Sequence, residues 1–577
     1  MESSTARAAS HAVPAAWGSD AIVAALAGAG TRLMFGVPGG GPNLDVVGAA
    51  AAAGLRFILA RGETAAVIMA ATYADLEGAP GAAVVTRGPG LASAVNGIAH
   101  AALDRLPVVV IADTVPAADA DRISHQRIDQ GALGRSVAKA AITVGGPRPG
   151  EAAARIVRMA LAPPPGPVIA SMDASSPGLT RPDGARPDDD GTPAALAGAS
   201  AASFLAGALR AARRPVLLLG TGAIPRTAAV RDALAGRGIP ALHTYRARGI
   251  LPDAGPDAAG LVTGGTMEWP LLSAADLVIG LGVDEAEMIP APWDYPARTI
   301  LITEPTPGPA LAAPAAYRGY FTGATALRMP LARALEVLAA GPGHDWPPGA
   351  GRAARAGAAG RLVSAAVASP GRLAPQQVVT TVRAGTPPQT IATVDAGAHM
   401  LVAMPLWEVP EPHRLLVSSG LATMGYALPA AIAAAVCAPR VPVVAFTGDG
   451  GLGMTLAEIE TAVRLSLRII VVVFNDAALS LIKIKQKPAG HGGDEAVSYR
   501  PVSFAGAAAA LGAAAAEVGT ERDLAAALAA ALRRPGPTVI DVSVDPAGYP
   551  AVMDLSRGQA GRRSVPGISR ALQARCP

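Results

Sequence analysis

An aspartate and an asparagine stand at the ends of two apolar segments, where their oxygens could bind a metal ion. Asp449 lies between two glycines and follows the apolar run 441–446, and Asn475 ends a second run, 469–474. Apolar residues at helical spacing lie between them, so the pattern predicts a strand, a helix and a parallel strand. The carboxyl ends of neighbouring parallel strands meet at the ligand-binding edge of an α/β sheet. A carboxylate and an amide oxygen there suit a hard divalent cation that holds a diphosphate, and glycines let backbone approach phosphates closely. The alternative is an ordinary turn followed by a loop asparagine.

The composition indicates a globular protein of several domains. At 577 residues the chain is too long for one core, and 51% of its residues are hydrophobic against 16% charged. No apolar run reaches the roughly 18 residues of a membrane span, and residues 1–16 make a poor signal peptide. With only Cys437 and Cys576 there is no disulfide framework. We therefore expect a cytoplasmic enzyme that spans no membrane.

The charge distribution argues against nucleic-acid binding. The net charge is only +4 and aromatic residues make up 3% of the chain. Basic residues gather only in the tail, which is either solvated or folds over a phosphate-bearing cofactor.

Short apolar runs alternate with helical patterns along most of the chain. This alternation predicts an α/β fold with three doubly wound parallel-sheet domains. Segments rich in Pro and Gly, 177–192 and 341–359, separate the domains. The predicted divisions are 17–178, 198–340, 372–550 and a basic tail, 551–577.

Several ordered motifs resemble one known family. In the first block they are 35–40, reading FGVPGG, 61–64, reading RGET, 86–90, reading TRGPG, and the pair Asn96-Gly97; in the third block, 419–429 reads SGLATMGYALP. Together with the Asp449 and Asn475 pattern they resemble the acetolactate synthase-like (large subunit) family of thiamine diphosphate-dependent enzymes. The resemblance extends over about 17–550. It implies a pyrimidine-binding, a central and a diphosphate-binding domain, in that order.

The resemblance assigns the cofactor and metal sites residue by residue. It implies Mg²⁺ bound by Asp449, Asn475 and the carbonyl of Ala477, an oxygen-only ligand set that suits this ion. Met424 would hold the cofactor bent, although ordinary core packing is its alternative, and His399 would contact the diphosphate unless it is a plain loop residue. The implied cofactor-binding set is Gly39, Gly88, Pro89, Asn96, His399, Ala422, Met424, Gly448, Gly450, Gly451 and Leu479.

The implied catalytic group is Glu63. In the family a carboxylate hydrogen-bonded to the aminopyrimidine shifts that ring toward its imino form, which then removes the thiazolium C2 proton. Such a carboxyl needs an apolar pocket and a raised pKa. His125 and Gln126 align with a loop that faces the active site in relatives, and His125 could act as a general acid or base.

The chain also departs from the family. Lys485 replaces a tryptophan that shapes the pocket of true acetolactate synthases, so it could pair with an anionic acceptor or simply face solvent; Ile482 is a further substrate-contact candidate. The family's FAD-associated residues are missing around 282–287, so FAD is a doubtful cofactor. The turn Gly220-Thr221-Gly222 hints at nucleotide binding but lacks a third glycine.

The expected reaction is loss of CO₂ from a small-molecule 2-oxo acid followed by carboligation to a second carbonyl. Simple 2-oxo acid decarboxylation or acyloin cleavage is the alternative, and a non-catalytic cofactor-binding homologue is a third possibility. Because the family shares its active sites between subunits, the resemblance implies a homodimer or homotetramer in which Glu63 of one chain meets Asp449 of another.

Overall fold

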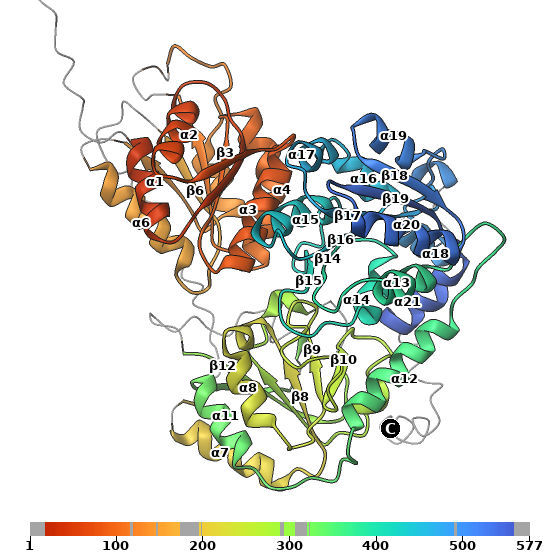
Figure 1. The fold of residues 1–577 in the computed structure, drawn as a ribbon. Helices are drawn as coiled ribbons and strands as arrows, with labels where there is room; N and C mark the ends of the chain where they lie inside the picture. The colour runs from red at the N-terminus through yellow and green to blue at the C-terminus, as the bar shows by residue number, and fades with distance from the viewer. Residues whose placement is uncertain are drawn as a thin grey trace, which may run out of the picture. The chain divides into compact units, whose positions relative to one another are not determined.

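The fold is known from a computed structural model (Figure 1). The structure describes residues 18–115, 119, 121–145, 148–172, 196–197, 199–288, 293–305, 320–321, 323–489 and 493–558. The chain divides into two compact units, one of Met1–Ala74 with Gly78–Gly184 and one of Asp75–Glu77 with Ala185–Pro577. We call them the N-terminal unit and the C-terminal unit.

The N-terminal unit contains one parallel sheet with the strand order β2-β1-β3-β4-β6-β5. Its strands are β1 (Leu33–Val37), β2 (Arg56–Leu59), β3 (Gly81–Val85), β4 (Val108–Asp113), β5 (Ala140–Val144) and β6 (Val168–Met172). Its helices are α1 (Gly18–Gly28), α2 (Pro42–Ala52), α3 (Glu63–Glu77), α4 (Pro89–Leu103), α5 (Gln130–Val137) and α6 (Pro149–Leu161).

The first sheet of the C-terminal unit has the parallel order β10-β9-β8-β11-β12-β13-β7. Its strands are β7 (Leu196–Ala197), β8 (Pro215–Leu219), β9 (Ala241–His243), β10 (Ala258–Leu261), β11 (Leu277–Leu281), β12 (Arg298–Thr303) and β13 (Thr325–Arg328). The helical elements are α7 (Ala199–Ala211), η2 (Thr221–Arg226), α8 (Thr227–Leu234), α9 (Trp269–Leu272), η3 (Glu285–Glu287), α11 (Leu331–Ala339) and α12 (Ala350–Ser364).

The second sheet of this unit has the parallel order β15-β14-β16-β17-β19-β18. Its strands are β14 (Ile391–Val394), β15 (Leu415–Val417), β16 (Val443–Gly448), β17 (Ile469–Asn475), β18 (Ala514–Val518) and β19 (Thr538–Ser543). The helical elements are α13 (Pro375–Ala384), α14 (Met400–Leu406), α15 (Ala427–Cys437), α16 (Asp449–Thr455), α17 (Glu458–Arg464), α18 (Ser480–Ala489), η4 (Asp494–Ala496), α19 (Phe504–Ala510), α20 (Glu521–Arg533), η5 (Pro546–Gly548) and α21 (Tyr549–Arg557).

The predicted fold class, three doubly wound parallel α/β sheets, is confirmed. Three local features differ from the sequence interpretation. The segment between β16 and β17 forms two short helices instead of one, residues 350–359 are helical, and the tail begins with α21. Runs of alanine and arginine favour helix in 350–359 despite the glycines there. The segment 177–192 and most of the basic tail lie outside the described residues.

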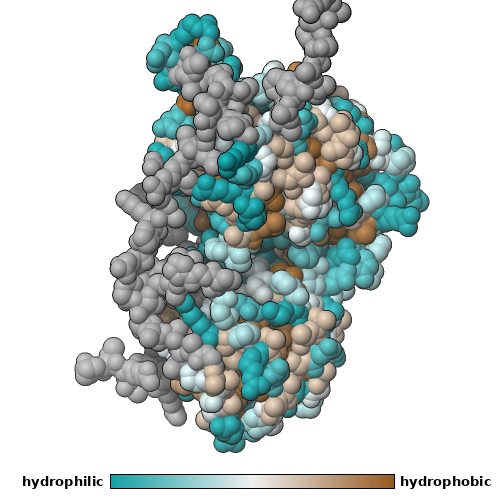
Figure 2. All heavy atoms as spheres, turned by 90° about the vertical axis from the view of Figure 1, so that its left-hand side faces the viewer, coloured by the Kyte–Doolittle hydropathy of each residue, from teal (hydrophilic) through white to brown (hydrophobic). Residues whose placement is uncertain are grey.

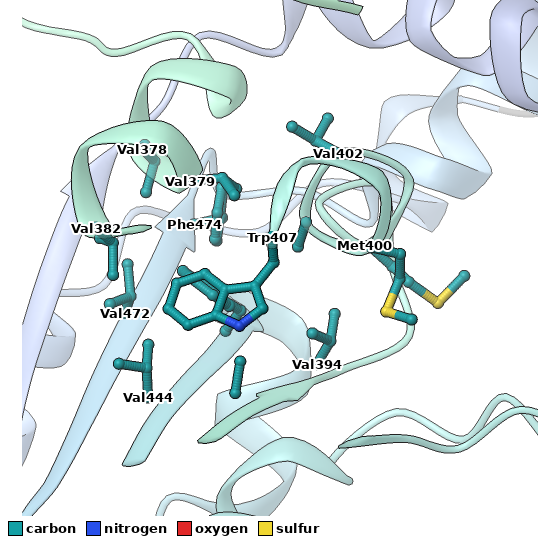
Figure 3. Close-up of a cluster of buried hydrophobic side chains, with 14 of the residues drawn as sticks. Val378, Val379, Val382, Val394, Met400, Val402, Trp407, Val444, Val472 and Phe474 are labelled. Atoms are coloured by element: carbon teal, nitrogen blue, oxygen red, sulfur yellow. The ribbon is translucent and has the colours of Figure 1, made fainter. Parts of the chain in front are cut away.

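A large apolar core fixes the strands of the third sheet. The indole of Trp407 lies among Val444 and Val472 of the strands and Val382 of α13 (Figure 3). Strands β16 and β17 run in register, with Gly448 opposite Phe474. Asp449 and Asn475 therefore emerge side by side at the carboxyl edge of the sheet, as the sequence pattern predicts.

Hydrophilic and hydrophobic residues are intermixed on the face that Figure 2 shows. None of the helices in the described part of the chain combines the length and the apolar character that a membrane crossing requires.

Candidate active site

Asp449 opens α16 directly after β16 and is almost fully buried. Its carboxylate accepts hydrogen bonds from the backbone N–H groups of Gly450, at 2.6 Å, and of Ala478, at 3.1 Å. Burial raises the pKa of Asp449, and the backbone donors lower it in part. A buried anionic oxygen donor at a sheet edge is suited to a divalent cation.

Asn475, at the end of β17, uses both hydrogens of its amide. Its Nδ2 donates to the carbonyl of Val502 and to Oδ1 of Asp541, each at 3.0 Å. Neither bond uses Oδ1 of Asn475, the atom that would bind a metal ion.

Ala477 lies in a left-handed conformation, with φ of 55°. Its carbonyl accepts the N–H of Tyr499 at 2.7 Å, which leaves a second lone pair. Among the described residues no three His, Cys, Asp or Glu side chains form a metal-binding cluster. The ligands that the resemblance implies are one carboxylate, an amide oxygen and a carbonyl oxygen, which are not a cluster of this kind, and their role stays a prediction.

A cavity of about 200 Å³ opens beside Asp449. It brings together most of the residues predicted for the third block, namely His399, Ala422, Met424, Gly448, Asp449, Gly450, Gly451, Leu479 and Ile482. Asn475, Ala477 and Lys485 are not among its lining residues. The cavity is lined mostly by apolar groups and has its acidic groups at one place, which suits a ligand with an apolar body and a metal-bound polyanionic end.

His399 is a buried polar residue in the cavity wall. Its ring stacks on Phe474 with centroids 5.3 Å apart, and its Nε2 is buried with no hydrogen-bond partner among the described residues. Burial lowers the pKa of His399 to about 4. An unsatisfied nitrogen in a cavity wall costs free energy unless a ligand binds it. A diphosphate offers only acceptor oxygens, so the predicted contact requires a proton on Nε2 of His399, which a bound polyanion would favour.

Met424 and Leu479 approach each other across Gly450. A Cβ atom at position 450 would lie 3.2 Å from Cε of Met424 and 2.9 Å from Cδ2 of Leu479. Ala422, two residues before Met424, is held at φ of 52°, a strained conformation for a non-glycine residue. These contacts place Met424 in the cavity wall, where it could hold a ligand, rather than only in the core.

Asp395 forms hydrogen bonds with two segments that contribute residues to the cavity wall. Its carboxylate accepts the N–H of Tyr426 at 2.9 Å and the hydroxyl of Thr447 at 2.8 Å. Burial raises the pKa of Asp395 to about 6. Its close neighbour is Gly451, where a Cβ atom would lie 2.2 Å from Oδ2 of Asp395. This glycine is needed for packing within the protein, whereas the sequence suggested only an approach to phosphate.

Two titratable residues of the cavity wall were missed. Asp476 directly follows Asn475, and its pKa is raised to about 6, mainly by burial and also by the charge of Asp449. Its position in the sequence beside the metal pattern could have revealed it. Tyr549 of α21 also lines the cavity, and burial holds its pKa well above 10. No sequence motif marks this tyrosine.

In the N-terminal unit, Glu63 is the first residue of α3 and is half-buried. Its Oε1 would lie 3.5 Å from a Cβ atom at Gly90, the second residue of α4. The hydroxyl of Thr64 donates to the carbonyl of Ser93 at 2.5 Å, which joins the beginnings of these helices. The structure thus brings Glu63 beside the 86–90 motif.

A buried polar network holds the loops of this unit. Asn43 accepts the N–H of Gly39 at 2.8 Å and donates to Asp113 at 3.2 Å. Asp113 in turn accepts the N–H of Arg87 at 2.8 Å, and its carbonyl accepts from Gln130 at 2.7 Å. Of these residues, the sequence assigned only Gly39 to the cofactor site.

The remaining candidates of this unit differ in exposure. Gly88 is buried, with φ of 65°, and a Cβ atom there would lie 2.5 Å from the carbonyl oxygen of Gln126. The side chains of Pro89, Asn96, His125 and Gln126 are exposed in the single chain. Their roles stay predictions.

Lys485, which replaces the family's tryptophan, differs in its surroundings from the nearby Lys483. Lys485 is exposed, whereas Lys483 pairs with Asp494 at 3.3 Å.

The turn at Thr221 is closed by Glu287, a buried carboxylate that accepts the N–H of Thr221 at 3.0 Å. A carboxylate of the protein therefore occupies the donor that a nucleotide phosphate would use.

Comparison with known proteins decides the family. Models of the thiamine pyrophosphate enzymes match the chain with their N-terminal TPP-binding domain at 16–133, their central domain at 202–306 and their C-terminal TPP-binding domain at 395–542. A catabolic acetolactate synthase from Raoultella terrigena is 30% identical over 561 residues, which cover 93% of this chain and 97% of that protein. The chain belongs to the thiamine pyrophosphate enzymes. It is of the acetolactate synthase type, and the predicted thiamine diphosphate cofactor is supported by these domains.

Other members of the family bear different names. A 2-hydroxyacyl-CoA lyase from Oryza sativa subsp. japonica is 29% identical over 585 residues, which cover 93% of this chain and 97% of that protein. The solved structure of a thiamine diphosphate-dependent 4-hydroxybenzoylformate decarboxylase from Rhodococcus jostii RHA1 superposes with a TM-score of 0.73, at 20% identity over 92% of this chain and 99% of that chain. The last similarity shows the shared fold.

Proposed function

We propose that the C-terminal cavity holds the diphosphate end of thiamine diphosphate through Mg²⁺. The observation that carries this proposal is the convergence of Asp449 and the partnerless Nε2 of His399 on one cavity. Asp449, Asn475 Oδ1 and the Ala477 carbonyl would bind the cation. His399 would contact the diphosphate, and Met424 and Leu479 would support the body of the cofactor.

The proposed reaction is decarboxylation of a 2-oxo acid followed by carboligation. Bound thiamine diphosphate supplies a nucleophilic carbon and an electron sink for the loss of CO₂. The chain binds and orients the reactants: Glu63 would hold a proton at the aminopyrimidine, and His125 and Gln126 would face the substrate. The apolar groups of the cavity wall would limit the access of water.

A simple decarboxylase or a lyase is the second candidate, because the chain is nearly as similar to a protein named as a lyase as to one named as an acetolactate synthase. In either case we propose a homodimer or homotetramer with active sites shared between subunits. A non-catalytic homologue is disfavoured, since Glu63, Asp449 and Asn475 are all present.

The experiment is incubation of the purified protein with thiamine diphosphate, Mg²⁺ and pyruvate, with CO₂ and products followed by mass spectrometry. Acetolactate would support carboligation, and acetaldehyde alone would favour the decarboxylase. C2 proton exchange of the cofactor is measured in parallel on the wild type and on Glu63→Gln. We expect Glu63→Gln to bind the cofactor but to lose exchange; unchanged exchange would remove Glu63 from its proposed role.

A further inference from the structure

We infer that Asp541 is a positioning residue that fixes Asn475 as a ligand for a divalent cation. This inference rests on the proposed metal site and adds a residue that the sequence motifs do not include. Asp541 lies in β19, next to β17, with its backbone opposite Val473. Since residues i and i+2 of a strand share a face, Asn475 extends on the same side of the sheet as Val473.

The hydrogen bonds of Asn475 permit only one orientation of its amide. Nδ2 donates at 3.0 Å to Oδ1 of Asp541 and at 3.0 Å to the carbonyl of Val502, and both partners are acceptors. Rotation of the amide by 180° would place Oδ1 against two acceptor oxygens and would lose both bonds. The two acceptors therefore reserve Oδ1 for another partner, and a cation is the partner that the neighbouring Asp449 favours.

Asp541 is itself held rigidly. Only 5% of its surface is exposed. Its second oxygen, Oδ2, accepts the N–H of Phe504 at 2.8 Å and that of Ala505 at 3.4 Å, at the beginning of α19. The carboxylate is thus anchored by backbone on one side and presents its other oxygen to Asn475. Asp541 does not line the cavity, so it would act on the cation through Asn475.

The test is the Mg²⁺ requirement of cofactor binding in Asp541→Ala. Thiamine diphosphate binding is followed by calorimetry at a series of Mg²⁺ concentrations, and thermal unfolding is recorded for each protein. Removal of such an outer partner of a ligand typically lowers metal affinity roughly 10- to 100-fold. We expect the half-saturating Mg²⁺ concentration to rise by that factor, with cofactor affinity approaching that of the wild type when Mg²⁺ is saturating.

Two matched controls separate this effect from general loosening. Asp545→Ala removes another aspartate that follows the same strand and that accepts the N–H of Ala547 at 2.9 Å. Ser503→Ala removes the side-chain cap of α19, where Ser503 accepts the N–H of Gly506 at 2.9 Å. We expect neither control to change the Mg²⁺ requirement. An equal shift in Ser503→Ala would overturn the inference, because the effect would then come from α19.

Asn475→Ala distinguishes failure of this inference from failure of the proposed function. If Asn475→Ala raises the Mg²⁺ requirement and Asp541→Ala does not, only the role of Asp541 is wrong. If Asn475→Ala also has no effect, the metal site itself is wrong. Should Asp541→Ala fail to fold, Asp541→Leu replaces it. Leucine fills the buried space of the carboxylate but accepts no hydrogen bond from Asn475, so the Mg²⁺ requirement must again rise, and an unchanged value overturns the inference.

Discussion

Substitution of Gly451 by alanine should damage the cofactor site, although the added methyl group is small. The new Cβ atom would lie 2.2 Å from Oδ2 of Asp395 and 2.9 Å from Oγ1 of Thr447. Ordinary contact begins at 3.4 Å, so the buried carboxylate would have to move by about 1 Å. Such a movement would break at least one of its bonds to Thr447 and Tyr426.

The magnitude follows from those bonds. A hydrogen bond to a buried charged group contributes about 1.5–3 kcal/mol. Asp395 connects the 396–399 turn to the segment that carries Ala422 and Met424, and both line the cavity. When the free energy of one such hydrogen bond is lost from cofactor binding, thiamine diphosphate affinity should fall about 10- to 150-fold.

The same helix offers the control. Gly453 also lies in α16, and a Cβ atom there would meet no atom within 4 Å. Gly453→Ala should therefore leave affinity unchanged and stabilise the helix slightly, by about 0.5–1 kcal/mol. Calorimetric titration of both variants with thiamine diphosphate at saturating Mg²⁺ is the assay. Equal affinities in Gly451→Ala and Gly453→Ala would refute the reasoning about Asp395.

Three further predictions concern the rest of the C-terminal unit. Burial lowers the pKa of His243 to about 4, so its contribution to stability is present above about pH 6.5 and is lost as the pH falls through 4; thermal unfolding of His243→Gln should depend less on pH in this window than that of the wild type, and identical profiles would contradict this. Asp253→Ala leaves the buried guanidinium of Arg248 without its ion-pair partner, which should cost about 3–5 kcal/mol in denaturant unfolding; the double variant Arg248→Met/Asp253→Leu should recover most of the loss, and a double variant no more stable than the single one would count against the pairing. Because Glu287 occupies the donor of the Thr221 turn, FAD should not bind in a flavin fluorescence titration, and a saturable stoichiometric signal would disprove this interpretation.

The sequence predicted the sheets and the meeting of Asp449 and Asn475 at one sheet edge, because both depend on local patterns. Apolar β-branched runs specify β16 and β17, and their register alone brings Asp449 beside Asn475. Family motifs then point to His399 and Met424, which do line the cavity.

The supporting residues could not be predicted in this way, because their roles arise from contacts between distant parts of the chain. Asn475 in β17 donates a hydrogen bond to Asp541 in β19, and Asn43 in α2 donates one to Asp113 at the end of β4. Gly451 is a further example. Its place in the motif suggested an approach to phosphate, but the structure shows that a side chain at this position would collide with the carboxylate of Asp395. Such partners carry no periodic pattern and no fixed spacing in the sequence.

The most direct test of the proposed site is a crystal structure of the protein with thiamine diphosphate and Mn²⁺ in place of Mg²⁺. We expect the anomalous signal of Mn²⁺ between the diphosphate and three protein oxygens: a carboxylate oxygen of Asp449, Oδ1 of Asn475 and the carbonyl oxygen of Ala477. A cofactor bound with its metal away from these oxygens, or a diphosphate outside the cavity beside His399, would contradict the account.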